Sequence, residues 1–338
     1  MTTTAVNPTR YTSPPQWDEA TVAVDTATSI LLVTHVSPDG DAIGSMLGLA
    51  NALRQRGCAV SWVAVDGGVP DYLAFLPGSD TVRTHVTGSY DLMISLDSSD
   101  EERTGEAGKF GRAHSKRVIN IDHHVTNTGF GDIHLVKVDA VSTTEIVQLW
   151  LATMPQPLTR AIAMPLLTGL VTDTIGFRIS AVHAGTLGLA QALIEAGAPL
   201  NEIMARTLSS KKFDVMKLWS YVLPTMTLEN GVIAANITRE DVKRAGLQEV
   251  TDGGLVEFLA QANEAQISVV FKEKDDTHVE IGFRCKFGFD VAQVAFQLGG
   301  GGHKQASGAT ITATLEEARA RVMPLLHEAY AQGTPAYT

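Results

Sequence analysis

The chain has 338 residues and a formal net charge of −11 at pH 7, with 44% hydrophobic and 19% charged residues. This length predicts about two domains, and the apolar content excludes a disordered or fibrous protein. The acidic balance argues against a protein that tracks a long nucleic acid through many phosphates, but it leaves short or small anionic substrates open.

The cysteines and the N-terminus indicate a cellular compartment. Cys58 and Cys285 are far apart and outside any C-x-x-C pattern, which argues against a disulfide framework or a zinc knuckle. Residues 1–16 are rich in Thr and Pro and lack the basic start and apolar stretch of a signal peptide. The chain contains no run of about 18 apolar residues that would span a membrane. We therefore expect a cytoplasmic protein without a membrane partner, and a disordered segment at 1–16.

Short β-branched runs alternate with helical or turn-rich patterns between Thr28 and Asp139, as in a parallel sheet with crossover helices. Apolar residues recur at helical spacing from Ile43 to Leu53, and Gly57 follows as a helix end. This pattern predicts one βαβ unit within an α/β fold. The predicted strands are Ile30–Val36, Ala59–Val65, Leu92–Asp97, Arg117–Asp122 and Ile133–Val138.

Longer apolar helical patterns follow from residue 143, and a second set of strands begins after residue 230. We place the domain boundary near residue 210, which gives a first domain at 17–210 and a smaller mixed α/β domain at 211–338. The predicted helices before the boundary and across it are Glu145–Leu151, Thr159–Val171, Gly185–Ala196 and Lys211–Val222. The later elements are strands Val232–Ile237, Ile267–Lys272, Val279–Arg284 and Ala309–Thr312, and a last helix Leu315–Tyr330.

The most informative stretch is T-H-V-S-P-D-G-D-A-I-G-S at residues 34–45, which places His35, Asp39 and Asp41 in the turn between the first strand and its helix. Ligands of open α/β sheets bind beyond the carboxyl ends of the strands, so a site is expected at this turn. Taken alone, an Asp helix cap beside a surface His explains the stretch equally well.

Acidic and imidazole side chains recur at the same position of later strands. Asp97 closes the strand that begins at Leu92, and Asp122-His123-His124 closes the next one. Asp173 lies where an apolar helical run gives way to a glycine-containing turn. Each of these residues alone could be a turn former or a helix terminator. Their joint placement favours one shared site.

The combined set contains four carboxylates, two imidazoles and no thiolate, and such oxygen-dominated sets suit Mn²⁺ or Mg²⁺ better than a structural zinc. Two divalent ions that share a carboxylate can activate water against a phosphoryl group. The sequence therefore predicts a two-metal site for phosphoester hydrolysis. The candidate ligands are His35, Asp39, Asp41, Asp97, His123 and Asp173.

The order and spacing of these motifs resemble the DHH phosphoesterase superfamily: H-x-x-x-D-x-D at 35–41, a lone Asp97, D-H-H at 122–124, and Asp173. The resemblance implies two bound Mn²⁺, with Mg²⁺ or another divalent ion as the alternative. It assigns one ion to His35, Asp39 and Asp97, and the other to Asp41, Asp97, His123 and Asp173. It also implies three catalytic residues: Asp97 bridges the ions, His124 contacts the scissile phosphate, and Asp122 supports the site from behind the ligands.

A glycine-rich stretch, G-G-G-G-H-K-Q-A-S-G at 299–308, is the main feature of the second domain. Consecutive glycines let backbone N–H groups approach an anion, and His303, Lys304 and Arg284 can add positive charge. The alternative is a flexible turn. The stretch is not a nucleotide-binding P-loop, because Lys304 is displaced and no Ser or Thr follows it.

This tail resembles the DHH-associated domain of the branch that includes bacterial oligoribonucleases active on pAp and cyclic-dinucleotide phosphodiesterases. The resemblance implies that the second domain faces the metal site across an active-site cleft and binds the part of the substrate remote from the scissile bond. The implied substrate-binding residues are Arg284, Gly301, Gly302, His303 and Lys304.

These observations predict a Mn²⁺-dependent phosphoesterase that hydrolyses short oligoribonucleotides (nanoRNA) to mononucleotides and dephosphorylates pAp to AMP by a two-metal-activated hydroxide. The alternative is a cyclic-di-AMP or linear-dinucleotide phosphodiesterase. An inorganic pyrophosphatase and a non-catalytic nucleotide sensor are less favoured. The expected partners are short RNA, pAp or a dinucleotide rather than a long nucleic acid, and a homodimer is left open.

Overall fold

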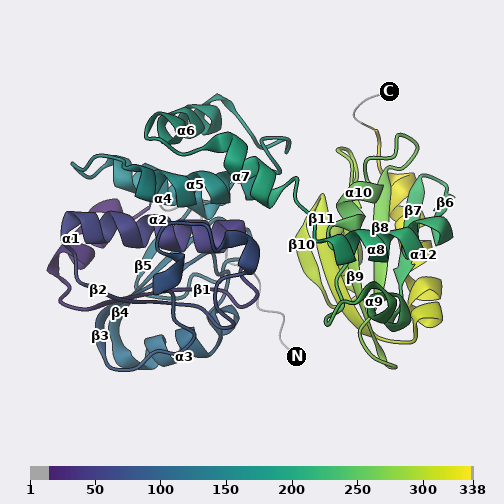
Figure 1. The fold of residues 1–338 in the computed structure, drawn as a ribbon, viewed down its shortest axis with the longest axis horizontal. Helices are drawn as coiled ribbons and strands as arrows, with labels where there is room; N and C mark the ends of the chain where they lie inside the picture. The colour runs from purple at the N-terminus through teal and green to yellow at the C-terminus, as the bar shows by residue number, and fades with distance from the viewer. Residues whose placement is uncertain (1–14, 336–338) are drawn as a thin grey trace. The chain divides into compact units, whose positions relative to one another are not determined.

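The computed structural model describes residues 15–335, apart from the side chain of His303, and divides into two compact units, Met1–Ser210 and Lys211–Thr338 (Figure 1). Of the segment predicted to be disordered, residues 1–14 lie outside the described residues. Gln16 is described, and its backbone N–H donates to the carbonyl of His134. Within residues 15–335, no helix has the length and apolar character required to cross a lipid bilayer.

The first unit is built on a fully parallel five-stranded sheet in the order β2-β1-β3-β4-β5. This arrangement confirms the predicted α/β class. The chain adds β2 on one side of β1 and β3 on the other, so the sheet has a switch point beside β1, where ligands of such folds bind. The strands are β1 (Ile30–Thr34), β2 (Val60–Ala64), β3 (Tyr90–Leu96), β4 (Ser115–Asp122) and β5 (Ile133–Val136).

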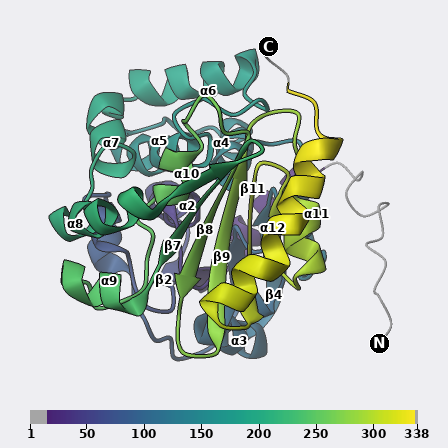
Figure 2. The same cartoon turned by 90° about the vertical axis from the view of Figure 1, so that its right-hand side faces the viewer.

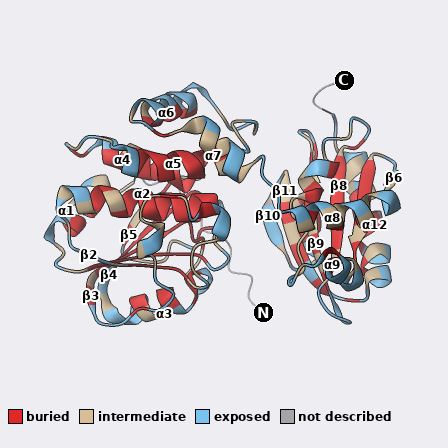
Figure 3. Cartoon of the chain, in the orientation of Figure 1, coloured by how far each residue is buried: buried red, intermediate tan, exposed pale blue. Residues whose placement is uncertain are grey.

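Helices cover both faces of this sheet, and the buried residues concentrate in the strands and in α2 and α5 (Figure 3). The first face packs against α1 (Trp17–Thr26), α2 (Gly40–Arg56), α4 (Thr143–Ala152) and α5 (Arg160–Asp173), with α6 (Ala184–Glu195) and α7 (Leu200–Thr207) beyond. The second face packs against α3 (Gly105–His114). The sequence did not predict α3, because its three glycines weaken the helical signal.

Helices α2 and α5 approach each other closely, and two glycines make the approach possible. A Cβ atom at Gly44 would lie 2.5 Å from the carbonyl oxygen of Pro165, and one at Gly169 would lie 2.7 Å from Asp41 Oδ1. Because α2 begins beside β1 and α5 ends at Asp173, this contact brings the ends of both helices to the same edge of the sheet.

We predict that Gly44→Ala destabilises the protein by about 1–3 kcal/mol, because the added methyl group meets backbone atoms of α5 that cannot move aside. Gly188→Ala is the matched control: Gly188 is an exposed glycine in α6 with no atom within 4 Å of its added Cβ. Because alanine has a higher helix propensity than glycine, this substitution should stabilise the protein by about 0.5–1 kcal/mol. Chemical denaturation of both variants measures their free energies of unfolding. Equal stabilisation by the two substitutions would contradict the close contact.

The second unit contains a mixed six-stranded sheet in the order β10-β11-β9-β8-β7-β6. Strands β7 and β8 are parallel, and the other neighbours are antiparallel. The strands are β6 (Thr227–Glu229), β7 (Val232–Ile237), β8 (Ile267–Glu273), β9 (His278–Cys285), β10 (Gly301–His303) and β11 (Ala306–Thr312). Figure 2 shows α12 running across this sheet.

Each face of the second sheet has its own core. Helices α11 (Ala292–Gln297) and α12 (Leu315–Gln332) pack on one face, and α8 (Phe213–Val222), α9 (Arg239–Ala245) and α10 (Leu255–Leu259) pack on the other. The mixed α/β prediction is confirmed, although β6, α9 and α10 were not predicted.

The glycine-rich stretch is partly a strand rather than only a loop. Gly301–His303 form β10, whose residues pair with Ala306–Gly308 of β11. A Cβ atom at Gly300 would lie 2.1 Å from the carbonyl oxygen of Gly308, and one at Gly302 would lie 2.6 Å from that of Ala306. Close packing against β11 therefore requires glycine at these two positions, whatever else the stretch binds.

Candidate metal centre

The carboxyl edge of the parallel sheet gathers the predicted ligands. His35 follows β1, Asp97 follows β3 and His123 follows β4, and these three strands are neighbours in the sheet. The other three carboxylates come from helix ends, with Asp41 in the first turn of α2. Asp39 caps α2, since its Oδ1 accepts from the backbone N–H groups of Asp41 and Ala42 at 3.0 Å, while Asp173 ends α5.

The side chains of all six predicted ligands converge. His35 Nε2 lies 3.5 Å from Asp97 Oδ2, and His123 Nε2 lies 3.7 Å from Asp97 Oδ1 and 3.4 Å from Asp173 Oδ2. Three groups have ligand atoms within 4.8 Å of one another: His35 with Asp39 and Asp97, Asp41 with His123 and Asp173, and Asp97 with His123 and His124. The first two groups resemble the two ion sites expected from the sequence. The third connects Asp97 to His123 and adds His124, which was not predicted as a ligand.

The two imidazoles are oriented as metal-binding imidazoles are. His35 Nδ1 lies 2.8 Å from the carbonyl oxygen of Val36, and His123 Nδ1 lies 3.3 Å from that of Ala140. With Nδ1–H assigned as the donor to each carbonyl, Nε2 is the atom that faces the carboxylates. At metal sites, a hydrogen bond from the other ring nitrogen to a carbonyl or carboxylate fixes the tautomer in the same way. The donor set therefore fits a hard divalent cation.

The carboxyl groups of the cluster differ in pKa, because they are buried and close to one another and to imidazoles. Burial, followed by the charge of Asp97, raises the pKa of Asp41 to about 7. Burial and the charge of Asp41 likewise raise the pKa of Asp173. Burial alone would also raise the pKa of Asp97, but the His35 hydrogen bond and the nearby imidazoles hold that pKa below its ordinary value. The cluster therefore cannot keep every carboxylate charged without a cation.

In the D-H-H segment and just after it, three side chains are linked by hydrogen bonds: His124, Asp122 and Asn127. His124 Nδ1 lies 2.7 Å from Asp122 Oδ1, and Asn127 Nδ2 donates to Asp122 Oδ2 at 2.6 Å. Burial would lower the pKa of His124, but the hydrogen bond to Asp122 raises it overall. The sequence did not identify Asn127, because an asparagine after a strand is usually a turn former.

Backbone strain is concentrated around the cluster. Among the described residues, five non-glycine residues have positive φ; one of them is the predicted ligand Asp97, and three others lie within four residues of a predicted ligand. These are Ser37 (56°), Asp97 (58°), Ile175 (51°) and Phe177 (65°). Such strain persists only where surrounding contacts impose it, and it is typical of binding and catalytic sites.

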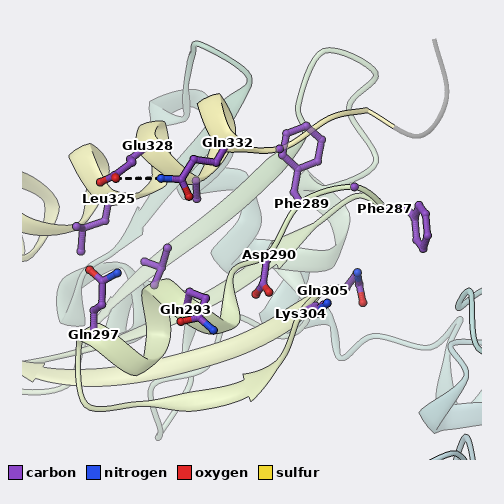
Figure 4. A pocket seen from close by; sticks show the side chains of 14 residues that line it. Phe287, Phe289, Asp290, Gln293, Gln297, Lys304, Gln305, Leu325, Glu328 and Gln332 are labelled. Carbon is purple, nitrogen blue, oxygen red and sulfur yellow. Dashed lines mark hydrogen bonds between the residues drawn. The ribbon is translucent and has the colours of Figure 1, made fainter.

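The predicted substrate-binding residues of the second unit do not form a single group. The Arg284 guanidinium bonds to the Glu257 carboxylate and donates to the Phe283 carbonyl at 2.8 Å. It lines a cavity of about 580 Å³ that also contacts Gly300, beside α10. Lys304 instead lines a cavity between α11 and α12, with Asp290 and Gln305 (Figure 4). Gly301 and Gly302 lie in β10, and the side chain of His303 is outside the described part of the chain.

The geometry defines an α/β protein in which carboxylates and imidazoles that could hold a metal ion are clustered at the switch point of the parallel sheet. Comparison with known families agrees with this class. A family model described as "DHH family, N-terminal domain" matches residues 29–170, and one described as "DHHA1 domain" matches residues 230–329.

Relatives match along most of the chain. A protein of Thermus thermophilus named bifunctional oligoribonuclease and PAP phosphatase NrnA is 34% identical, with 88% of this chain and 89% of the relative covered. A Bacillus subtilis protein of the same name is 30% identical, with 84% and 89% covered. The solved structure of an exopolyphosphatase-related protein from Bacteroides fragilis has a TM-score of 0.85 and 26% identity, and the match covers 97% of this chain and 98% of that one.

The chain belongs to the DHH family, as the sequence motifs predicted.

We predict that Mn²⁺ stabilises the protein more at about pH 8 than at about pH 5.5. The pKa of Asp41 rises from 3.8 to about 7, so its contribution to stability is fully present below 3.8 and is lost as the pH rises through about 7. A cation binds the deprotonated cluster and offsets this loss. Thermal unfolding with and without Mn²⁺ measures the effect. An equal shift in Tm at both pH values would contradict it.

Proposed function

We propose that this chain is a phosphoesterase that hydrolyses short oligoribonucleotides to mononucleotides and dephosphorylates pAp to AMP, with two divalent ions, preferably Mn²⁺. One observation carries the proposal: seven carboxylate and imidazole side chains from four separate segments converge in three overlapping groups at the carboxyl edge of the parallel sheet, where open α/β folds bind ligands. The names of the Thermus and Bacillus relatives supply the substrate class.

In this proposal, His35, Asp39 and Asp97 hold one ion, and Asp41, Asp97, His123 and Asp173 hold the other. When bound, such ions lower the pKa of a water molecule and stabilise the negative charge of the phosphoryl group in the transition state. Asp97 supports this assignment because its Oδ2 faces His35 and its Oδ1 faces His123, at 3.5 and 3.7 Å. It is thus the carboxylate placed to contact both proposed ions.

His124 is proposed to contact the scissile phosphate, with Asp122 as its positioning partner. The hydrogen bond from Nδ1 to Asp122 fixes the direction of the ring, and the Asp122 charge raises the His124 pKa and so favours the protonated ring. A protonated imidazole can donate to a phosphate oxygen and stabilise the charge that develops there. Asn127 holds Asp122 from the other side and so keeps this arrangement rigid.

The second unit is proposed to bind the part of the substrate remote from the scissile bond. Arg284 is the strongest candidate, since it lines a cavity with the glycine-rich stretch on the α10 face of the sheet. Gly301, Gly302 and His303 are proposed beside it. Lys304 lies on a different cavity, so its part in the same subsite has less support. The net charge of −11 supports short substrates over long nucleic acids, and a cytoplasmic location stays a prediction.

We predict that Asp97→Asn lowers hydrolysis of every substrate by at least about 100-fold, because residues that only support metal ligands are already worth about 10- to 100-fold. Asp91→Asn is the control, since Asp91 lies at the opposite end of the same strand and bonds to Thr28 and Lys116. The assay compares a diribonucleotide, pAp, a longer RNA, cyclic di-AMP, polyphosphate and pyrophosphate with added Mn²⁺. Retained turnover by Asp97→Asn would refute the bridging role, and a wild-type preference for pyrophosphate or long RNA would refute the substrate class.

We predict that Arg284→Ala raises KM for a diribonucleotide by about 10-fold and leaves Mn²⁺ affinity unchanged, because it removes a charged hydrogen bond to substrate and none to the ions. Arg239→Ala serves as the control, since Arg239 pairs with Asp276 and Glu273 at an exposed position of the same unit. Steady-state kinetics with a parallel Mn²⁺ titration measures both effects. An Arg284→Ala enzyme with unchanged KM would remove Arg284 from the substrate subsite.

A further inference from the structure

The first turn of α4 contacts two of the predicted ligands at once, although no motif includes it. The backbone N–H of Thr143 donates to Asp41 Oδ2 at 2.6 Å, and that of Thr144 donates to Asp41 Oδ1 at 3.0 Å. The Thr143 hydroxyl donates to Asp97 Oδ1 at 2.9 Å. Thr143 therefore joins a carboxylate of α2 to the carboxylate that follows β3.

These contacts lie in the interior of the first unit. Thr143 is 0% exposed, Asp41 1% and Asp97 2%. Hydrogen bonds to a charged carboxylate in such surroundings are stronger than those between neutral groups, and the positive end of the α4 dipole adds to them. A threonine has few χ1 rotamers available, so its hydroxyl is held in one direction.

A purely structural role in starting the helix does not explain the Thr143 hydroxyl. The cap of α4 is Ser142, whose Oγ accepts from the backbone N–H of Glu145 at 3.1 Å. The Thr143 hydroxyl instead points to Asp97, a residue held at a φ of 58°. Its partner atom, Oδ1, is the same oxygen that lies 3.7 Å from His123 Nε2.

We propose that Thr143 is a positioning residue that fixes the separation and orientation of the Asp41 and Asp97 carboxylates, and thereby the affinity of the cluster for divalent ions. The inference rests on the metal-dependent function proposed above. Thr143 touches neither ion nor substrate in this scheme. Its hydroxyl sets the lone-pair direction of Asp97, while its N–H holds Asp41, so that the ligands of both proposed ions are preorganised before a cation arrives.

Three substitutions at Thr143 separate the hydroxyl from the packing of the side chain. Thr143→Val keeps the shape and the backbone N–H but removes the hydroxyl, and Thr143→Ala removes the hydroxyl without the risk of crowding. Thr143→Ser restores the hydroxyl. The matched control is Thr168→Val in α5, which removes an equally buried hydroxyl that donates to the carbonyl of Met164, away from the carboxylates.

The experiment is a calorimetric titration of the full chain with Mn²⁺ in the absence of substrate, with the unfolding temperature of each metal-free variant measured in parallel. We expect Thr143→Val and Thr143→Ala to weaken Mn²⁺ binding by about 10- to 100-fold. Thr143→Ser should stay within about threefold of the wild type, and Thr168→Val should bind as the wild type does. If Thr143→Val fails to fold, Thr143→Ala carries the same expectation.

The outcomes distinguish this inference from the proposed function. Wild-type Mn²⁺ affinity in the folded hydroxyl-free variants would overturn the inference and leave the proposed function standing. Weak binding by Thr143→Ser, equal to that of Thr143→Ala, would overturn it too, since packing rather than the hydroxyl would then matter. A wild-type chain that binds no divalent cation would overturn both.

Discussion

The structure of the first unit depends on how it accommodates several carboxylates in one small buried region. Asp41 and Asp97 are almost fully buried, and Asp39 and Asp173 adjoin them. Imidazoles and backbone N–H groups compensate part of this charge. The imidazoles hold the pKa of Asp97 low, while burial raises that of Asp41 to about 7. The remaining imbalance is the physical reason to assign cations to the site.

The fold creates this region by bringing together distant parts of the chain. Adjacent parallel strands place residues 35, 97 and 123 at one edge, which any sheet of this order does. The contact between α2 and α5 at Gly44 then places Asp41 and Asp173 across from each other. Positive φ angles at Asp97 and in the turn after Asp173 accompany this convergence, so local conformational strain is balanced by global packing.

The sequence predicts the strands and the convergence of the candidate ligands well for one reason: side chains that end parallel strands must meet. It does not reveal Thr143 or Asn127, since a Thr at a helix start and an Asn after a strand are ordinary caps and turn residues. Nor does it reveal that Arg284, in β9, and Lys304, in the turn between β10 and β11, line different cavities, because neighbouring parts of a sheet and its turns can face opposite sides. The sequence also does not predict the helix α3 and the strand β10, because their glycines have low helix and strand propensity.

The most direct test of the account is a crystal structure of the protein grown with Mn²⁺, with the ions located by their anomalous scattering. The account predicts two anomalous peaks in each chain at the carboxyl edge of the parallel sheet, with the Asp97 carboxylate in contact with both. A single peak, peaks elsewhere on the chain, or an Asp97 that touches neither ion would contradict it.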